Sequence, residues 1–370
     1  MEIRKIKRNK PRIALIGEQV YTAKLAVALA TKYGYEVDVL TRADDEQKEI
    51  ENTSAIRIKK FGRKSHPWNL PLHLGTIAWV FFYLLSQGKS YRIYHAHSAS
   101  TAFAMKAASW LTRVPTLLTV HSNHVFDKSW TLRKILDRVM FLETKYSKEV
   151  SISECFLKAV NVNENIQVVP YGIRTEPFDA VDSARSPNQF NVLYVGRLSR
   201  EKGVDVLLKA WEGLRDIPLK IMGDGPLATE LKNYAQKKNI HQIEFLGYLS
   251  QEGYHAYMKG AGFIVVPSVC YENFPRIIAE AYAYGVPVLA SRLGTLPELV
   301  RGKETGLMFV SGNPCDLAQK ARWLWTQDED RERMNRIARQ QYEKEYAAEK
   351  NYTLLMNIYK RTIEMYRASR

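Results

Sequence analysis

Short apolar stretches and amphipathic stretches alternate along most of the chain. Residues 12–17, 36–41 and 92–98 have the length and composition of buried strands, and 22–34 has the spacing of a helix that ends on a glycine. Further strands are predicted at 116–122, 149–153 and 166–172. Repeated strand-helix-strand units are typical of a parallel sheet covered by helices on both faces. The pattern therefore predicts an α/β fold of the doubly wound type.

A second series of the same kind begins at residue 190, after a polar stretch that we interpret as a linker, 179–189. Its predicted strands are 190–196, 218–223, 243–249, 262–268 and 287–291, and its predicted helices are 204–214, 227–238, 251–261 and one that starts near 276. The last quarter of the chain has a helical pattern throughout. Two open sheets in tandem are expected to leave a ligand-binding cleft facing the carboxyl ends of both sets of strands.

The length of 370 residues suits two domains rather than one core. We predict an N-terminal Rossmann-like domain over 1–178, completed by the C-terminal helix at about 350–370. A second Rossmann-like domain is predicted over 190–349.

Composition indicates a globular protein, with 46% hydrophobic and 25% charged residues. The cysteines are Cys155, Cys270 and Cys315, an odd number without metal-ligand spacing, which favours a reducing compartment. The longest apolar run, 77–85, is about half of a membrane span, and no signal-peptide core follows the basic N-terminus. We therefore expect a cytoplasmic protein that does not cross a membrane.

The net charge of +15 comes mostly from the first half of the chain. Its densest basic cluster consists of Arg57, Lys59, Lys60, Arg63 and Lys64, and it is followed by the aromatic residues Trp68, Trp79, Phe81 and Phe82. Such a segment suits anionic lipid headgroups, which would place the protein peripherally on the inner face of the membrane. It is equally typical of a solvated charged loop before a core helix. No nucleic-acid recognition motif accompanies the charge, so nucleic acid is not an expected partner.

Two glutamates, Glu272 and Glu280, lie eight positions apart around a proline, Pro275, that suits the first turn of a helix. The free N–H groups at such a helix start favour a phosphate, whereas carboxylates are good acceptors for hydroxyl groups. The combination suggests a ligand with phosphate and several hydroxyls. Taken alone, the same pattern also fits a helix cap and a surface charge.

A second candidate site lies upstream, where a predicted strand ends at Gly196 and a helix begins near residue 203. Arg197 and Lys202 on the turn between them are placed to neutralise a diphosphate. The glycines Gly223 and Gly225, at the end of the next strand, would let the backbone approach a flat ligand.

Several motifs together resemble the retaining family 4 glycosyltransferases of the GT-B fold, which use nucleotide sugars. In the second half these are "GRLSREKG", "GDGP", "FLGYLS", "PSVCYENFPRIIAEAYAYGVPVLAS" and "GTLPELV". In the first half, "YHAHS", "TVHS" and "VVPYGI" resemble the acceptor-binding part of the same family, so the resemblance spans nearly the whole chain. It implies two Rossmann-like domains facing across a cleft.

The resemblance implies a role for each matching residue. Arg197 and Lys202 would hold the diphosphate, Glu280 the ribose hydroxyls and Glu272 the hydroxyls of the transferred sugar, with His121 near that sugar. The remaining donor-site residues are Gly196, Gly223, Asn273, Phe274 and Pro275, and the acceptor or phosphate loop would include Gly17, Tyr21 and His97. His95, His97, His121 and His124 could suggest a metal site, but no carboxylate or cysteine completes the spacing. The family resembled uses no metal, and no cofactor is expected.

The activity that these inferences predict is sugar transfer with retention, from a nucleoside diphosphate sugar to a lipid-linked or cell-envelope saccharide. UDP is the expected nucleotide in preference to GDP. Two alternatives stay open: a nucleotide-sugar epimerase or phosphorylase on the same fold, and a non-catalytic member that binds sugar nucleotide or membrane.

This sequence departs from the family pattern at four places. The first loop keeps only Gly17 of a usual glycine pair, so Gln19 or Tyr21 must fill that space. Arg92 replaces an aspartate, Thr295 replaces a glycine, and Tyr171 precedes Gly172 where asparagine is usual. These departures leave the donor site intact and the acceptor open.

Overall fold

The computed structural model describes residues 10–17, 20–42, 53–61, 70–120, 148–151, 166–168, 190–272 and 274–368. The chain forms two compact units. The first comprises Met1–Ile152, Phe156–Val169 and Tyr352–Arg370, and the second comprises Ser153–Cys155 and Pro170–Asn351. The domain limits predicted at residues 178 and 190 fall at or beside residues outside the described ranges, so these limits stay a prediction.

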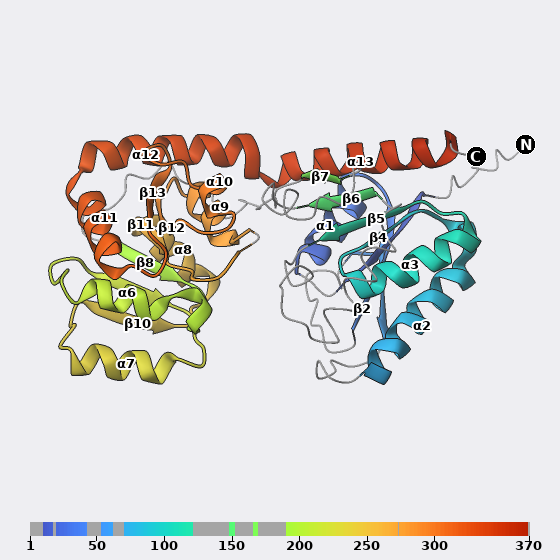
Figure 1. Ribbon diagram of the computed structural model, residues 1–370. Coiled ribbons are helices and arrows are strands. Elements are labelled where there is room, and N and C mark those ends of the chain that lie inside the picture. Colours follow the sequence, from blue (N-terminus) through green and yellow to red (C-terminus); the bar gives the residue numbers. More distant parts are fainter. Residues whose placement is uncertain are drawn as a thin grey trace, which may run out of the picture. The chain divides into compact units, whose positions relative to one another are not determined.

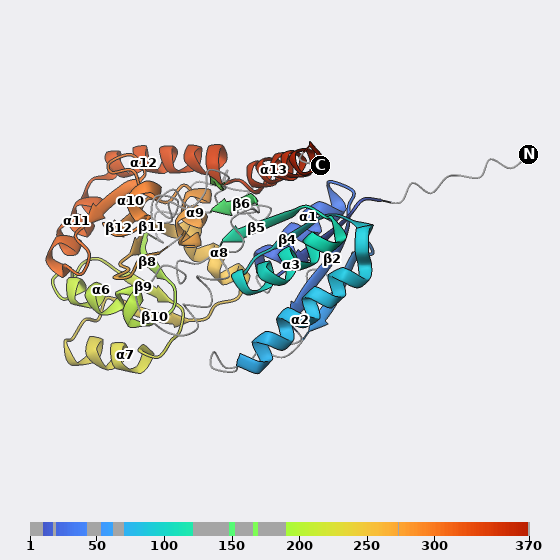
Figure 2. The ribbon, with the colours of Figure 1, turned by 45° about the vertical axis from the view of Figure 1, so that its right-hand side comes forward.

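The first unit is built on a parallel sheet in the order β3-β2-β1-β4-β5-β6-β7. Its strands are β1 Arg12–Ile16, β2 Glu36–Arg42, β3 Ile56–Phe61, β4 Tyr91–Ala96, β5 Thr116–Val120, β6 Lys148–Ser151 and β7 Ile166–Val168. Its helices are α1 Val20–Thr31, α2 Leu70–Gln87 and α3 Ala99–Thr112, with a 3₁₀ turn, η1 Gly88–Ser90, between α2 and β4. Figures 1 and 2 show α2 and α3 side by side.

The second unit contains a parallel sheet in the order β10-β9-β8-β11-β12-β13. Its strands are β8 Asn191–Val195, β9 Leu219–Met222, β10 Ile243–Gly247, β11 Ala261–Val266, β12 Val288–Ser291 and β13 Gly306–Phe309. Its helices are α6 Val204–Trp211, α7 Ala228–Lys237, α8 Gln251–Gly260, α9 Arg276–Ala283, α10 Leu296–Leu299, α11 Pro314–Thr326 and α12 Asp328–Gln341. A 3₁₀ turn, η4 Arg200–Lys202, precedes α6, and a π-helical turn, η5 Tyr342–Tyr346, follows α12.

Both sheets have the strand order of a doubly wound Rossmann-like fold, which confirms the predicted fold class. In each sheet the order reverses beside the first strand, at β1 and β4 in one unit and at β8 and β11 in the other. Because all strands are parallel, their carboxyl ends meet at one edge, and this switch point is where such sheets bind ligands. The candidate residues Gly17, His97, Gly196 and Arg197 all follow the switch-point strands directly.

Several elements differ from the sequence prediction, among them helix α10 and strand β13, which were not predicted. β10 ends at Gly247, two residues earlier than predicted, because that glycine has a left-handed φ of 65° that breaks the extended conformation. The segment that begins at Ile56 was interpreted as a charged surface or loop, but it forms edge strand β3, since Phe61 is buried and packs against Trp79 of α2 with its ring tilted by 35°. Helix α3 was not predicted.

The last helix, α13 Ala348–Ala368, starts in the second unit and continues into the first. Within the first unit it buries Leu355, Ile358 and Tyr359. The Tyr359 hydroxyl lies 2.7 Å from Nδ1 of His95 on β4, and Nε2 of the same histidine lies 2.7 Å from Oγ1 of Thr119 on β5. Both nitrogens of this buried ring are therefore occupied by structural contacts.

Candidate functional site

The loop between β8 and α6 carries Arg197 and Lys202, as the sequence predicted. It ends at Gly203, which has a left-handed φ of 67°, and a Cβ there would lie 2.0 Å from the carbonyl oxygen of Pro267. Only glycine fits this close approach. The approach brings the loop after β8 against the loop after β11, which leads to Glu272.

Lys202 and Glu272 form an ion pair, with Nζ 2.6 Å from Oε1. The hydroxyl of Ser268, directly beyond β11, donates to the same carboxylate oxygen at 2.6 Å. Thr295 Oγ1 donates to the backbone carbonyl of Glu272 at 2.8 Å. The threonine that departs from the family pattern thus fixes the loop that carries the carboxylate. The family resemblance assigned Lys202 to the diphosphate and Glu272 to the transferred sugar, and the structure brings the two side chains into direct contact.

The loop has a positive electrostatic environment. Glu201 lies between the two basic residues, and its pKa is lowered first by the hydroxyl of Ser199 and further by the charges of Arg197 and Lys202. The Arg197 side chain is exposed, and its backbone carbonyl accepts a hydrogen bond of 2.8 Å from the buried Tyr194 hydroxyl. The backbone is therefore fixed while the guanidinium is free to meet an anion.

The glycines after β9 serve the packing of two loops. Gly223 has a φ of 125°, and a Cβ on it would lie 2.0 Å from the carbonyl oxygen of Gly196. A Cβ on Gly225 would lie 2.4 Å from the carbonyl oxygen of Leu198. The backbone that closely approaches these two glycines is therefore the loop after β8. The sequence had suggested that a ligand makes this approach.

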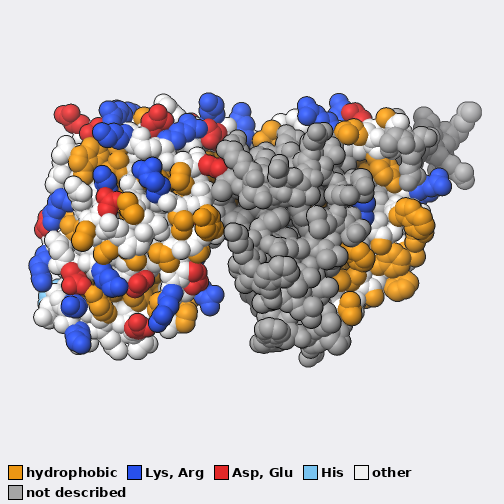
Figure 3. Space-filling model, in the orientation of Figure 1, with side chains coloured by type: hydrophobic (Ala, Val, Ile, Leu, Met, Phe, Trp, Pro, Cys, Tyr) orange, Lys and Arg blue, Asp and Glu red, His pale blue; other side chains and the backbone are white. Residues whose placement is uncertain are grey.

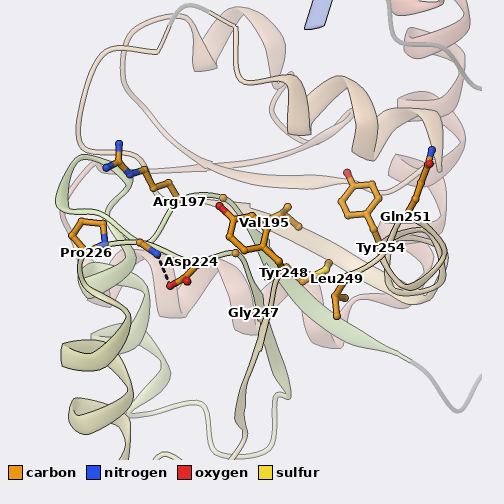
Figure 4. Close-up of a pocket in the computed structure, with 13 residues that line it drawn as sticks. Val195, Arg197, Asp224, Pro226, Gly247, Tyr248, Leu249, Gln251 and Tyr254 are labelled. Carbon is orange, nitrogen blue, oxygen red and sulfur yellow. Dashed lines mark hydrogen bonds between the residues drawn. The ribbon is translucent and has the colours of Figure 1, made fainter. Parts of the chain in front are cut away.

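A pocket of about 960 Å³ opens at the carboxyl ends of β8, β9 and β10 (Figure 4). It is lined by Val195, Gly196, Arg197, Met222, Gly223, Asp224, Gly225, Pro226, Gly247, Tyr248, Leu249, Gln251 and Tyr254. Sequence reasoning missed the contribution of Tyr248, Leu249, Gln251 and Tyr254. The signal was present in the motif "FLGYLSQ", but the strand was predicted to run through 249, which hid the turn at Gly247.

Glu280 on α9 borders this pocket through Tyr254 of α8. The Tyr254 hydroxyl donates to Oε2 of Glu280 at 2.6 Å, and Arg276 donates to Oε1 at 3.1 Å. Burial and the neighbouring Glu280 carboxylate raise the pKa of Tyr254 well above its ordinary value, so the hydroxyl stays a donor. The Glu280 side chain is only 19% exposed, which rules out the interpretation as a simple surface charge.

Helix α9 also lacks a side-chain cap at its N-terminus. Pro275 occupies the N-cap position with extended backbone, no side chain caps the helix, and the Pro275 carbonyl accepts from the N–H of Ile278 at 3.0 Å. Phe274 is buried and packs edge-on against Tyr346. Asn273, predicted beside them, lies outside the described residues.

In the first unit, Gly17 and His97 come together at the switch point of the sheet. The N–H of His97 donates to the carbonyl of Ile16 at 2.9 Å, and a Cβ on Gly17 would lie 2.8 Å from Cβ of His97. The buried His97 ring lies 4.2 Å from the ring of His95. Among the described residues, no cluster of histidine, cysteine, aspartate and glutamate side chains could hold a metal ion.

Other predicted residues cannot be placed. His121, His124, Gln19 and Tyr171 lie outside the described residues, as do Arg63, Lys64 and Trp68 of the basic segment. Tyr21 belongs to α1, but its side chain is also outside the described set.

Two family models match the chain. Residues 176–341 match the model described as "Glycosyl transferases group 1", and residues 17–145 match the "Glycosyl transferase 4-like domain".

Similar proteins agree with these matches. The uncharacterized glycosyltransferase MJ1607 of Methanocaldococcus jannaschii is 26% identical, over 94% of this chain and 95% of the relative. The D-rhamnosyltransferase WbpZ of Pseudomonas aeruginosa is 28% identical, over 63% of this chain and 64% of the relative. Among solved structures, Anabaena Alr3699/HepE in complex with UDP and glucose aligns with a TM-score of 0.75 at 18% identity, covering 93% of this chain and 98% of that one.

The two matched ranges follow one another along the chain, and both models describe glycosyl transferases. The residues they match contain strands β2 to β5 of the first sheet, the whole second sheet and the site around Arg197, Lys202 and Glu272. The chain therefore belongs to the group 1 glycosyltransferases and is a glycosyltransferase of the GT-B fold.

Proposed function

We propose that this glycosyltransferase moves a sugar from a nucleoside diphosphate donor, with UDP preferred to GDP, and retains the configuration at the anomeric carbon. The observation that carries the proposal is the arrangement at the carboxyl ends of β8 and β11. There Arg197 lines a pocket of about 960 Å³, while Lys202 on the same loop contacts Glu272 at 2.6 Å. The solved complex of Alr3699/HepE with UDP and glucose supports the choice of nucleotide.

The proposed chemistry follows from where charge develops. Breaking the bond between sugar and phosphate builds negative charge on the leaving diphosphate. Fixed cations aimed at that charge lower the barrier, because they need little rearrangement during the reaction. Arg197 and Lys202 supply these cations, and Glu272, oriented by Lys202 and Ser268, accepts hydroxyl groups of the transferred sugar. Glu280, oriented by Tyr254, accepts the ribose hydroxyls.

We propose that these cations replace a divalent metal in neutralising the diphosphate. Turnover should then persist when a chelator such as EDTA is present at millimolar concentration. Loss of turnover in EDTA that added Mg²⁺ or Mn²⁺ restores would contradict this part of the proposal.

The proposed acceptor is a lipid-linked or cell-envelope saccharide. The basic and aromatic first half of the chain supports it, and so does the similarity to the D-rhamnosyltransferase WbpZ. The proposed location is the cytoplasm, in keeping with the free thiols of Cys270 and Cys315. No helix in the described ranges is long and apolar enough to span a bilayer.

The test is a panel of UDP and GDP sugars, with release of the nucleoside diphosphate measured with and without lipid extracts. Lys202→Ala and Glu272→Ala should each lower kcat/KM by on the order of a hundredfold, which corresponds to about 3 kcal/mol of transition-state stabilisation. NMR of the early product should show the anomeric configuration of the donor.

The matched control is Lys209→Ala. Lys209 lies on α6 in the same unit, exposed and paired with Asp205 one turn away, so turnover should stay unchanged. Unchanged turnover in Lys202→Ala, or inversion at the anomeric carbon, would refute the proposed mechanism.

A further inference from the structure

The outer face of helices α2 and α3 exposes large apolar side chains. We call it the α2–α3 apolar face and define it by Leu74, Phe82, Leu85, Phe103, Trp110 and Leu111. Trp110 is 80% exposed and Phe82 is 64% exposed. Single exposed apolar residues are ordinary on protein surfaces, but a contiguous group of this size marks an interaction site.

These side chains gather on one surface because the two helices pack together. Leu74, Phe82 and Leu85 recur at intervals of eight and three, and Phe103 and Trp110 are seven apart, so each helix presents one stripe. The Tyr94 hydroxyl lies 3.3 Å from the carbonyl of Gly88, just after α2, and 3.1 Å from Oγ1 of Thr112, at the end of α3. The C-terminal ends of the two helices are therefore adjacent.

Figure 3 shows hydrophobic side chains gathered over α2 and α3, with Lys and Arg beside them. Exposed basic residues follow both helices: Lys89 lies in η1 directly after α2, and Arg113 caps α3. On the neighbouring edge strand, Lys59 is exposed and shares its face with Phe61, which contacts α2. The apolar face therefore has a basic margin.

The elements that carry this face contribute no acidic residue of their own. The sequence contains no aspartate or glutamate from Asn52 to Phe126, a stretch that includes all of β3, α2 and α3. Of the basic residues first predicted to meet lipid, Arg57 already bonds Asp38 at 2.7 Å and Glu36 at 3.4 Å. Among the described residues, the large exposed apolar side chains thus lie on α2 and α3 and not on β3.

We propose that the α2–α3 apolar face docks on an anionic lipid leaflet. Its aromatic and aliphatic side chains would enter the boundary between headgroups and acyl chains, where tryptophan is favoured, while Lys89 and Arg113 meet the phosphates. A second copy of the same face fits less well, since it would add positive charge with no carboxylate to pair with it. An acidic protein partner is the remaining alternative, and the experiment below distinguishes it from a lipid leaflet.

The experiment is co-sedimentation of the full-length protein with vesicles of phosphatidylglycerol and phosphatidylcholine, without nucleotide. The protein should bind, and Phe82→Ser/Trp110→Ser should weaken partitioning at least tenfold, because two large side chains no longer leave water. Lys89→Gln/Arg113→Gln should weaken partitioning into anionic vesicles by on the order of tenfold, and binding should fall as salt is raised. Brominated lipid should quench the tryptophan fluorescence of the wild type more than that of Trp110→Phe.

The matched control is Met365→Ser, which removes a 52% exposed side chain on α13 of the same unit and should leave vesicle binding unchanged. Circular dichroism melts and UDP affinity verify that each variant is folded and that any loss is independent of the donor site. Equal vesicle binding by wild type and Phe82→Ser/Trp110→Ser would overturn the proposal. The proposal would also be overturned if the wild type formed a concentration-dependent dimer that Phe82→Ser/Trp110→Ser abolishes. The same holds if the wild type bound an acidic protein but no vesicles, and this variant abolished that binding.

Discussion

At the scale of single residues, the two glutamates of the site have different fixed partners. Glu272 accepts from Lys202 and Ser268, and Glu280 accepts from Tyr254 and Arg276. A cap or a free surface charge would need neither arrangement. Because Tyr254 also lines the pocket, its hydroxyl orients the Glu280 carboxylate beside the pocket.

Tyr254→Phe tests this role. Removing the hydroxyl takes one donor from a half-buried carboxylate, a hydrogen bond typically worth about 1.5–3 kcal/mol. We expect the Kd for UDP and the KM for the donor to rise at least several-fold, with kcat changed less. Calorimetry and steady-state kinetics measure both quantities.

Tyr234→Phe is the matched control. Tyr234 also donates to a glutamate, Glu212, but Tyr234 lies on α7 and does not line the pocket. Its donor affinity should equal that of the wild type. If Tyr254→Phe behaves in the same way, Tyr254 has no positioning role.

At the scale of elements, one buried aspartate links four strands of the first sheet. Asp38 on β2 is fully buried and accepts from Arg12 of β1, Arg57 of β3 and the hydroxyl of Tyr91 on β4. Burial raises the pKa of this carboxyl, but the hydrogen bonds from Tyr91 and Arg57 and the charge of Arg12 outweigh it, so the pKa lies below its ordinary value. The charged segment thus becomes an edge strand rather than a loop.

Asp38→Asn should lower the free energy of unfolding of the first unit by about 3 kcal/mol, since two guanidinium groups lose their buried counter-charge. The folded pKa is depressed, so this contribution is complete above about pH 3.9 and is lost as the pH falls through the folded pKa. The difference between wild type and variant should therefore shrink below about pH 4. Hydrogen exchange in β1 to β4 during urea titration measures it.

Asp205→Asn serves as the control, because its exposed pair with Lys209 should contribute less than about 0.5 kcal/mol. A difference between Asp38→Asn and wild type that stays constant from pH 5 to pH 2 would contradict the assigned cause.

At the scale of the whole molecule, the chain returns to its first unit at the end. Helix α13 begins in the second unit, yet Tyr359 is buried in the first against His95. The core of the first unit is therefore completed by residues that follow the second unit in the sequence. Truncation or mutation near the C-terminus should act on the N-terminal sheet.

Tyr359→Ala should destabilise the first unit by about 3–5 kcal/mol, the usual cost of removing a buried aromatic side chain. Hydrogen exchange should rise in β4 and β5 while the second unit, from β8 to α12, stays protected. Met365→Ala on the exposed side of the same helix should change little. Uniform loss of protection in both units would show that α13 does not act on the first unit alone.

Much of this protein could be predicted from the sequence. Alternating apolar segments fix two parallel sheets, because buried parallel strands need continuous apolar runs. The spacing of Arg197, Lys202, Glu272 and Glu280 indicated a candidate site, since residues that follow parallel strands meet at one edge. Helix α3 was missed because exposed apolar side chains such as Trp110 blur its amphipathic pattern. Edge strand β3 was missed because exposed charges such as Lys59 interrupt its apolar pattern.

The sequence by itself determined the fold and the family and supplied the candidate residues of the donor site, because these depend on local periodicity and chain order. Only the tertiary structure decided which residues touch. The Lys202–Glu272 ion pair, the Tyr254 contact to Glu280, the Asp38 network and the α2–α3 apolar face all join positions far apart in sequence. Such contacts depend on how folded elements pack, and no pattern along the chain specifies that.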